Sequence, residues 1–300
     1  MPGAVSTKGI HYILNRGLST SGKPLLVFIH GIGTWHYCFE QMAQHFHSEG
    51  FSTLQADNWG MGFSEYPSDK SEDAMFWGGQ GHVDQLHDLL HELQLDNQAF
   101  FLVGHSMGGA IATLYADKHP SPHLLGICLL APAGVMDCPL NLQLLRTFHG
   151  VSCFREYALG GLQKDKVNIN NIKNFGDFRD KESADAMASH INIQRQHINN
   201  PNAILALFCC ARFFPLCSLH ATVDRVCRSG RRVLVLFGTD DRTVPPDVTL
   251  SYWERAAAPN VSTRRCPGAH LFFLESEVRD VVHGIMAKFL LGEGSSLSRL

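Results

Sequence analysis

Short apolar runs alternate with amphipathic segments over the first 130 residues of the chain. Residues 25–29 (LLVFI) form a continuous apolar run with the length of a buried strand. Similar runs follow at residues 51–56, 99–103 and 124–130. Segments with apolar residues at helical spacing lie between them, at residues 37–48, 83–93 and 110–118. This alternation is typical of βαβ units, so the pattern predicts an α/β fold with a mostly parallel central sheet flanked by helices.

The alternation breaks after about residue 133 and resumes after residue 229. Polar stretches there are mixed with one apolar segment, AILALFCCARFFPLC, which indicates a mainly helical inserted subdomain. The resumed pattern predicts a strand, a helix, a weak edge strand and a last helix, at residues 232–237, 248–257, 262–266 and 278–291. We therefore expect four parts: a core (1–133), a cap (134–229), the rest of the core (230–291) and a flexible tail (292–300).

Composition excludes several classes of protein. The 300 residues are 45% hydrophobic and 18% charged, which fits a globular chain with a sizeable core. The net charge of −3, from 25 basic and 28 acidic residues, provides no basic field for nucleic acid. The longest apolar stretch, residues 203–211, is too short to span a bilayer, so no integral membrane segment is expected. A small-molecule partner is the better expectation.

The cysteines and the two ends of the chain bear on location. Nine Cys, an odd number without paired zinc-type spacing, follow an N-terminus that lacks the apolar core of a signal peptide. A reducing compartment is therefore expected, without a metal or organic cofactor. The chain ends in Ser298, Arg299 and Leu300, a variant of the Ser-Lys-Leu peroxisomal address. This ending predicts binding to the peroxisomal import receptor, with a cytoplasmic location as the alternative.

A candidate nucleophile stands at the end of the third apolar run. Residues 104–109 read GHSMGG, a GxSxG pattern between a predicted strand and a predicted helix. Chemistry at such a turn needs glycine on both sides, because the strained backbone leaves no room for Cβ atoms while Ser Oγ stays exposed. The context rather than the bare pattern favours Ser106 as a nucleophile over an ordinary glycine-rich turn.

A serine nucleophile needs a base and an acid, and candidates for both follow later strands in the expected order. His270 lies in a loop before the last predicted helix, 29 residues after Asp241. Among 17 His, only its position in this order distinguishes His270 as the general base. Charge and periodicity do not separate Asp240 from Asp241, and Asp137 is a third candidate for the acid.

Two backbone amides are candidates for an oxyanion hole. Met107 supplies the amide that follows the nucleophile, and Ile32, in the loop His30-Gly31-Ile32-Gly33 after the first run, supplies the second. The small neighbours of Ile32 let the backbone face an ester. We interpret His30 as a residue that supports this loop rather than as a catalytic group.

Four motifs in this order resemble the α/β-hydrolase superfamily, in its capped serine-hydrolase branch. His30-Gly31 is similar to the family's HG loop, residues 57–64 (DNWGMGFS) to its DxxGxGxS turn, and GHSMGG to its elbow. Residues 238–245 resemble its acid loop, GxxDxxxP, in which Asp241 rather than Asp240 takes the place of the acid. The resemblance covers residues 25–133 and 231–290 and leaves the cap unmatched.

The resemblance implies a reaction class. A serine at the elbow, where dehalogenases and epoxide hydrolases carry aspartate, implies acyl transfer to water. The chain is similar to monoacylglycerol lipases, carboxylesterases and C–C bond hydrolases. Together with the peroxisomal address, this favours a serine esterase acting on lipid-derived acyl esters. A C–C bond hydrolase, a carboxylesterase for small substrates and a non-catalytic ligand receptor remain alternatives.

The apolar cap segment at residues 201–217 has two interpretations. It either lines an acyl pocket above the elbow or buries the cap's own helix against the core. Under the first interpretation the substrate-binding side chains are expected to include Leu205, Phe208, Phe213 and, beside the base, Leu271.

Overall fold

The computed structural model of the chain describes residues 3–17, 22–148, 177–255 and 258–292, together with residues 156 and 160. Most of residues 149–176 of the predicted cap lie outside these ranges. The predicted peroxisomal ending, Ser298, Arg299 and Leu300, also lies outside the described residues, so it stays a prediction.

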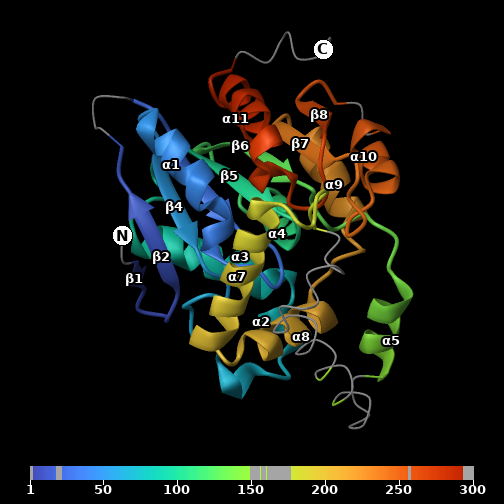
Figure 1. The fold of residues 1–300 in the computed structure, drawn as a ribbon. Coiled ribbons are helices and arrows are strands. Elements are labelled where there is room, and N and C mark those ends of the chain that lie inside the picture. Colours follow the sequence, from blue (N-terminus) through green and yellow to red (C-terminus); the bar gives the residue numbers. More distant parts are fainter. Residues whose placement is uncertain are drawn as a thin grey trace.

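A sheet of eight strands forms the centre of the protein (Figure 1). The six parallel strands match the predicted strands: β3 (Leu25–Ile29), β4 (Ser52–Ala56), β5 (Phe100–His105), β6 (Leu124–Leu130) and β7 (Arg232–Gly238), from the apolar runs, and β8 (Val261–Cys266), from the weak edge strand. Their order in the sheet is β4-β3-β5-β6-β7-β8. The antiparallel strands β1 (Ala4–Val5) and β2 (His11–Asn15), which were not predicted, extend the sheet beside β4. The predicted α/β-hydrolase type of fold is confirmed.

Helices cover both faces of the sheet (Figure 1). The first face carries α1 (Glu40–Ser48) and α11 (Ser276–Leu290), which meet where the rings of His45 and His283 stack 4.3 Å apart. The second face carries α3 (Gly79–Glu92), α4 (Met107–Lys118), α9 (His220–Arg228) and α10 (Pro246–Arg255). There α4 packs between α3 and α9, and Tyr252 Oη of α10 donates to Asp224 of α9.

Three short helices complete the core: η1 (His36–Phe39), η2 (Ser68–Lys70) and α2 (Ala74–Trp77). A further turn, η4 (Phe272–Leu274), begins two residues after His270. Because η1 and η4 begin just after loops at the carboxyl ends of strands, they help to fix the ends of those loops.

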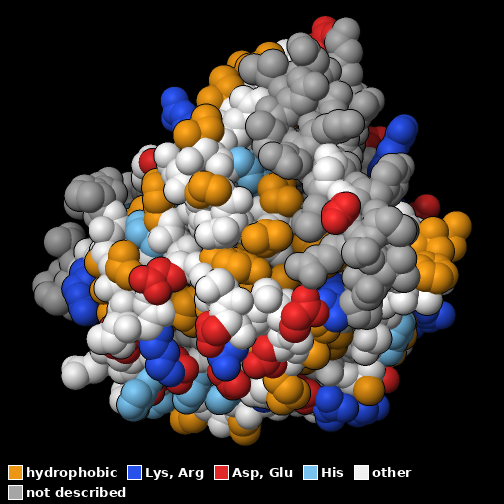
Figure 2. Space-filling view, turned by 90° about the horizontal axis from the view of Figure 1, so that it is seen from below, with side chains coloured by type: hydrophobic (Ala, Val, Ile, Leu, Met, Phe, Trp, Pro, Cys, Tyr) orange, Lys and Arg blue, Asp and Glu red, His pale blue; other side chains and the backbone are white. Residues whose placement is uncertain are grey.

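The chain between β6 and β7 supplies helices at one end of the sheet. These are α5 (Leu140–Phe148), α7 (Ala184–Asn199) and α8 (Ala203–Phe213), and α8 packs against α2, α5 and α7. By contrast, α9 lies within the predicted cap range but packs against α4 of the core. Figure 2, which views this end, shows apolar side chains scattered among charged ones. None of the helices in the described residues is long and apolar enough to cross a membrane.

Candidate active site

The backbone at Ser106 is strained, as a nucleophile elbow requires. Ser106 joins β5 to α4 with φ 54° and ψ −118°, a region that non-glycine residues seldom adopt. A Cβ on Gly104 would lie 2.3 Å from the Gly108 carbonyl oxygen, and one on Gly108 only 2.0 Å from the Ile29 carbonyl oxygen. The turn can therefore form only with glycine at both positions, and the Ser106 side chain does not cap α4.

His270 and Asp241 form a buried pair at the carboxyl edge of the sheet. Nδ1 of His270 lies 2.8 Å from Oδ2 of Asp241, and both side chains are almost fully buried. The other carboxylate oxygen accepts the backbone N–H groups of Thr243 and Val244, each at 2.9 Å. Because Asp241 is fixed by these amides and faces Nδ1, it orients the ring so that Nε2 is the nitrogen available to a reacting group.

The other two candidate acids lie elsewhere. Asp240 has a side chain that is 53% exposed and pairs with Arg179 at 3.8 Å. Asp137 is exposed in the segment between β6 and α5. Of the three carboxylates that the sequence left open, Asp241 is thus the one hydrogen-bonded to His270.

His105 connects the elbow to the loop that carries His270. Its Nε2 donates to the His270 carbonyl oxygen at 3.1 Å, and the two rings lie 4.6 Å apart. Burial, with a smaller effect of His270, lowers the pKa of His105 well below its usual value, so the ring is neutral. The residue before the nucleophile and the candidate base are therefore joined directly.

The loop after β3 presents the second candidate oxyanion donor. The Gly31 carbonyl accepts from His30 Nδ1 at 2.8 Å, from Thr34 Oγ1 at 3.1 Å and from Thr34 N at 3.4 Å. In a trans peptide the N–H points opposite to the C=O, so these bonds set the direction of the Ile32 N–H. Among the described residues the amides of Ile32 and Met107 have no acceptor. A Cβ on Gly31 would lie 3.0 Å from Ser106 Cβ, so the loop adjoins the nucleophile.

His30 lies inside the protein and supports this loop. Its Nε2 accepts the Asn58 N–H at 2.9 Å, which leaves the proton on Nδ1 for the Gly31 carbonyl. Burial, only partly offset by Asp57, lowers the pKa of His30. These contacts agree with the supporting role expected from the sequence.

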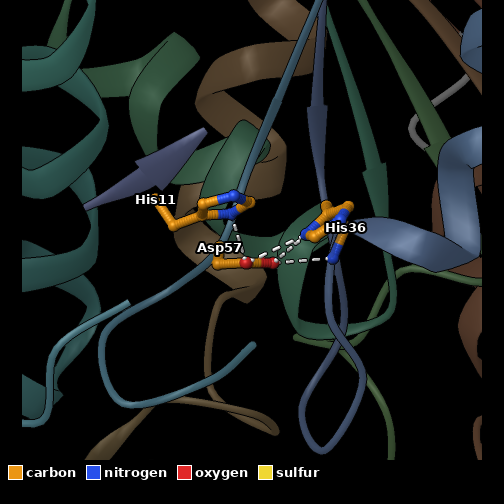
Figure 3. A group of neighbouring side chains, drawn as sticks. All are labelled: His11, His36 and Asp57. Atoms are coloured by element: carbon orange, nitrogen blue, oxygen red, sulfur yellow. Dashed lines mark hydrogen bonds and ion pairs between the residues drawn. The ribbon is translucent and has the colours of Figure 1, made fainter. Parts of the chain in front are cut away.

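A buried carboxylate holds the far end of the same loop (Figure 3). Asp57 Oδ2 accepts from His11 Nδ1 at 2.8 Å and from His36 Nδ1 at 2.9 Å, and Oδ1 accepts the His36 N–H at 2.7 Å. The Phe63 N–H is a further donor. Burial alone would raise the pKa of Asp57, but the hydrogen bonds from His11 and His36 hold it below its usual range. The sequence placed Asp57 in a motif but gave no sign of its two imidazole partners.

This group is the one cluster of possible metal ligands in the described residues. The ligand atoms of His11, His36 and Asp57 lie within 4.8 Å of one another. However, both imidazole Nδ1 atoms lie at hydrogen-bond distance from the carboxylate, and backbone amides take its remaining positions. Since the network is complete without an ion, we assign it a structural role that ties β2 and η1 to the turn after β4.

A small cavity with mainly apolar exposed surface lies between α7 and the loop of His270. It is lined by Leu271, by α7 and by the segment before it, including Phe178, Ala186 and Ile193. Of the four expected lining residues, Leu271 faces this cavity. Leu205, Phe208 and Phe213 belong to α8, which packs against α2 and α5, and their role stays a prediction.

Comparison with known proteins gives the family. The family model described as "Serine aminopeptidase, S33" matches residues 20–277. A monoacylglycerol lipase of Homo sapiens is 42% identical over 81 residues, which are 26% of this chain and 24% of the relative. A proline iminopeptidase of Chitinophaga pinensis is 30% identical over 113 residues, 37% of this chain and 36% of the relative. The chain thus spans about a quarter to a third of the length of these two relatives.

Solved structures show the same fold at low sequence identity. An esterase of Exiguobacterium antarcticum has a TM-score of 0.72 at 16% identity, covering 94% of this chain and 95% of the other. An enol-lactonase of Burkholderia xenovorans has a TM-score of 0.69 at 17% identity, covering 94% and 96%. With the match to most of its length, the chain belongs to the serine aminopeptidase S33 family of α/β-hydrolases.

Proposed function

We propose that this hydrolase cleaves carboxylic esters through a covalent acyl-enzyme on Ser106. The observation that carries the proposal is the strained backbone of Ser106. The residue before it, His105, donates to the carbonyl oxygen of His270, which forms the buried pair with Asp241. A serine nucleophile, a base and an orienting acid are the parts needed for acyl transfer. The proposal requires Ser106 Oγ to come within hydrogen-bond reach of His270 Nε2 during the reaction.

The proposed cycle has two halves that use the same groups. Ser106 Oγ attacks the ester carbonyl while His270 Nε2 takes its proton, and the tetrahedral oxyanion accepts hydrogen bonds from the Ile32 and Met107 amides. His270 returns the proton to the leaving alcohol. A water molecule, deprotonated by His270, then attacks the acyl-enzyme, and His270 gives that proton to Ser106 Oγ as the bond to the acyl group breaks and the acid leaves. Asp241 keeps the ring in the required tautomer throughout.

Two observations support a lipid-derived acyl group as substrate. The small cavity beside Leu271 is lined by Phe178, Ala186, Ile193 and Leu271 together with four polar residues, and its exposed surface is mainly apolar, which is compatible with contact to hydrocarbon. Among the relatives is a monoacylglycerol lipase, although the match covers only about a quarter of that protein.

Hydrolysis of an amide is the second candidate. The family model is that of a serine aminopeptidase, and a proline iminopeptidase is among the relatives. The same nucleophile, base and oxyanion donors serve esters and amides, so the leaving group decides between them.

The test is hydrolysis of p-nitrophenyl esters from acetate to palmitate, with proline p-nitroanilide alongside and Ser106→Ala as the blank. Activity that depends on Ser106 and peaks at eight carbons or longer is expected. Activity on short esters only would favour a small-substrate carboxylesterase, and turnover of the anilide alone would favour the peptidase.

Labelling by a fluorophosphonate separates the remaining alternatives. Labelling at Ser106 without ester or amide turnover would favour C–C bond cleavage. Absence of both labelling and turnover would refute the proposal and favour a non-catalytic receptor.

A further inference from the structure

A buried glutamine of the cap contacts the loop that presents the Ile32 amide. Gln196 lies on α7 with a fully buried side chain. Its Nε2 donates to the Gly33 carbonyl oxygen at 3.2 Å, and its Oε1 accepts the Gly62 N–H at 2.8 Å. One amide group thus bridges the loop after β3 and the turn after β4, from a residue 163 positions away from Gly33.

The contact at Gly33 reaches the Ile32 amide through two peptide groups. The peptide between Gly33 and Thr34 accepts from Gln196 at its carbonyl and donates from its N–H to the Gly31 carbonyl. The Gly31 carbonyl belongs to the same rigid peptide as the Ile32 N–H. Gly33 itself has φ 74°, a conformation that glycine adopts without a steric penalty, so the hydrogen bonds within the turn and from Gln196 fix the turn.

We propose that Gln196 is a positioning residue that couples the docked cap to the oxyanion hole. With α7 in place, its amide holds the 31–34 turn so that the Ile32 N–H faces the oxygen of the tetrahedral intermediate. The inference rests on the proposed function, because it assigns Gln196 a part in transition-state stabilisation rather than in binding the acyl chain.

Other contacts anchor α7 without touching this turn, and they provide a matched control. Asn200, which follows α7, donates through Nδ2 to the carbonyls of Gly60, Gly62 and Ser64 at 3.0–3.3 Å. Tyr37 Oη lies 2.7 Å from Ser189 Oγ near the middle of α7. If Gln196 were only another anchor of the cap, its removal would have the same consequences as removal of Asn200.

The decisive variant is Gln196→Glu, followed over pH. A protonated Glu can donate to the Gly33 carbonyl and accept from Gly62, whereas an ionised Glu cannot donate. Burial raises the pKa of such a carboxyl, so protonation occurs within the working range. We expect kcat relative to the wild type at the same pH to be about 10²-fold lower at pH 8, with little change in KM. The ratio should recover as the pH falls towards 5.

Two more variants complete the experiment, with circular dichroism at each pH to measure the folded fraction. Gln196→Met, which keeps the shape without donor or acceptor, should lower kcat at all pH values without recovery. Asn200→Ala should lower the melting temperature but change kcat less than about threefold, because its contacts bypass the 31–34 turn.

Each outcome decides the question. A kcat ratio for Gln196→Glu that does not vary with pH, or an equal loss of kcat in Asn200→Ala, would overturn the inference. If Gln196→Glu unfolds at pH 8, the kcat of Gln196→Met decides instead, and an unchanged value refutes the coupling. A wild type without Ser106-dependent turnover would refute the proposed function itself, which is a separate result.

Discussion

Two segments meet at Ser106, and they are fixed in different ways. The elbow at residues 104–109 is fixed by backbone packing, because its glycines leave no space beside the carbonyls of Gly108 and Ile29. The loop at residues 30–36 is fixed by side chains from three places: its own His30 and Thr34, the core residue Asp57 and the cap residue Gln196. The nucleophile's position is therefore a property of the core alone, whereas the direction of the Ile32 amide depends on the core and the cap together.

The largest effect is expected at Asp241, which belongs to neither segment. Its loss of kcat is therefore the reference against which the effects in the two segments are compared. Asp241→Asn should lower kcat by about 10⁴-fold, because an amide favours the wrong tautomer of His270. Asp240→Asn, one residue away but exposed, is the control and should change kcat less than about twofold. Kinetics on a p-nitrophenyl ester measure both variants. Equal losses in the two would mean that the His270–Asp241 pair has no catalytic part.

Next in size is the elbow's dependence on backbone packing. Gly108→Ala should lower the free energy of unfolding by about 4 kcal/mol or more, since its Cβ would overlap the backbone at Ile29. Gly284→Ala in α11 has open space for its Cβ and should be neutral or stabilise by up to about 1 kcal/mol. Urea unfolding followed by circular dichroism compares them. Similar stability of the two variants would show that the elbow tolerates movement.

The dependence of the loop on the charge of Asp57 should appear as a loss of stability at low pH. Because hydrogen bonds to His11 and His36 hold the pKa of Asp57 below its unfolded value, its stabilisation is present above about pH 4. It is lost as the pH falls through the folded-state pKa. Asp57→Asn should cost about 2 kcal/mol at pH 7 and flatten the decline of stability below pH 4. Urea unfolding between pH 7 and 2.5 measures this, and an undiminished decline in the variant would contradict it.

The smallest effect is expected for a Thr→Val substitution, made once in the loop and once in α4, next to the elbow. Thr34→Val removes a hydroxyl donor from the Gly31 carbonyl and should lower kcat about fivefold, for a loss of roughly 1 kcal/mol. Thr113→Val removes a similar bond to the Gly109 carbonyl within α4, where the helix is fixed by packing, and should leave kcat nearly unchanged. Steady-state kinetics of both variants test the contrast, which disappears if the two losses are equal.

The parts of the site that lie at strand ends could be predicted from the sequence. Ser106 and Asp241 each follow an apolar run and His270 follows the predicted weak edge strand, and parallel strands bring their carboxyl ends to one edge of the sheet. The geometry also agrees with His30 as a support for the loop after β3.

The residues that hold this loop could not be predicted in the same way. Gln196 acts through a side-chain amide on a backbone carbonyl 163 residues away, and such a contact leaves no periodicity or local motif. β2 was missed because HYILN is short, mixed in polarity and only half-buried, so its pairing with β4 decides its conformation. In α8 the sequence showed an apolar helix but not the neighbour against which it packs.

The bridge from Gln196 to Gly33 and Gly62 also bears on engineering by domain exchange. In capped hydrolases, the substrate can be changed by building chimaeras in which one insertion replaces another. Here a transplanted cap would bring a new acyl pocket but would remove an amide that completes the catalytic backbone. A donor cap would therefore need a glutamine at the position of Gln196, or a redesigned 31–34 turn that is rigid without it.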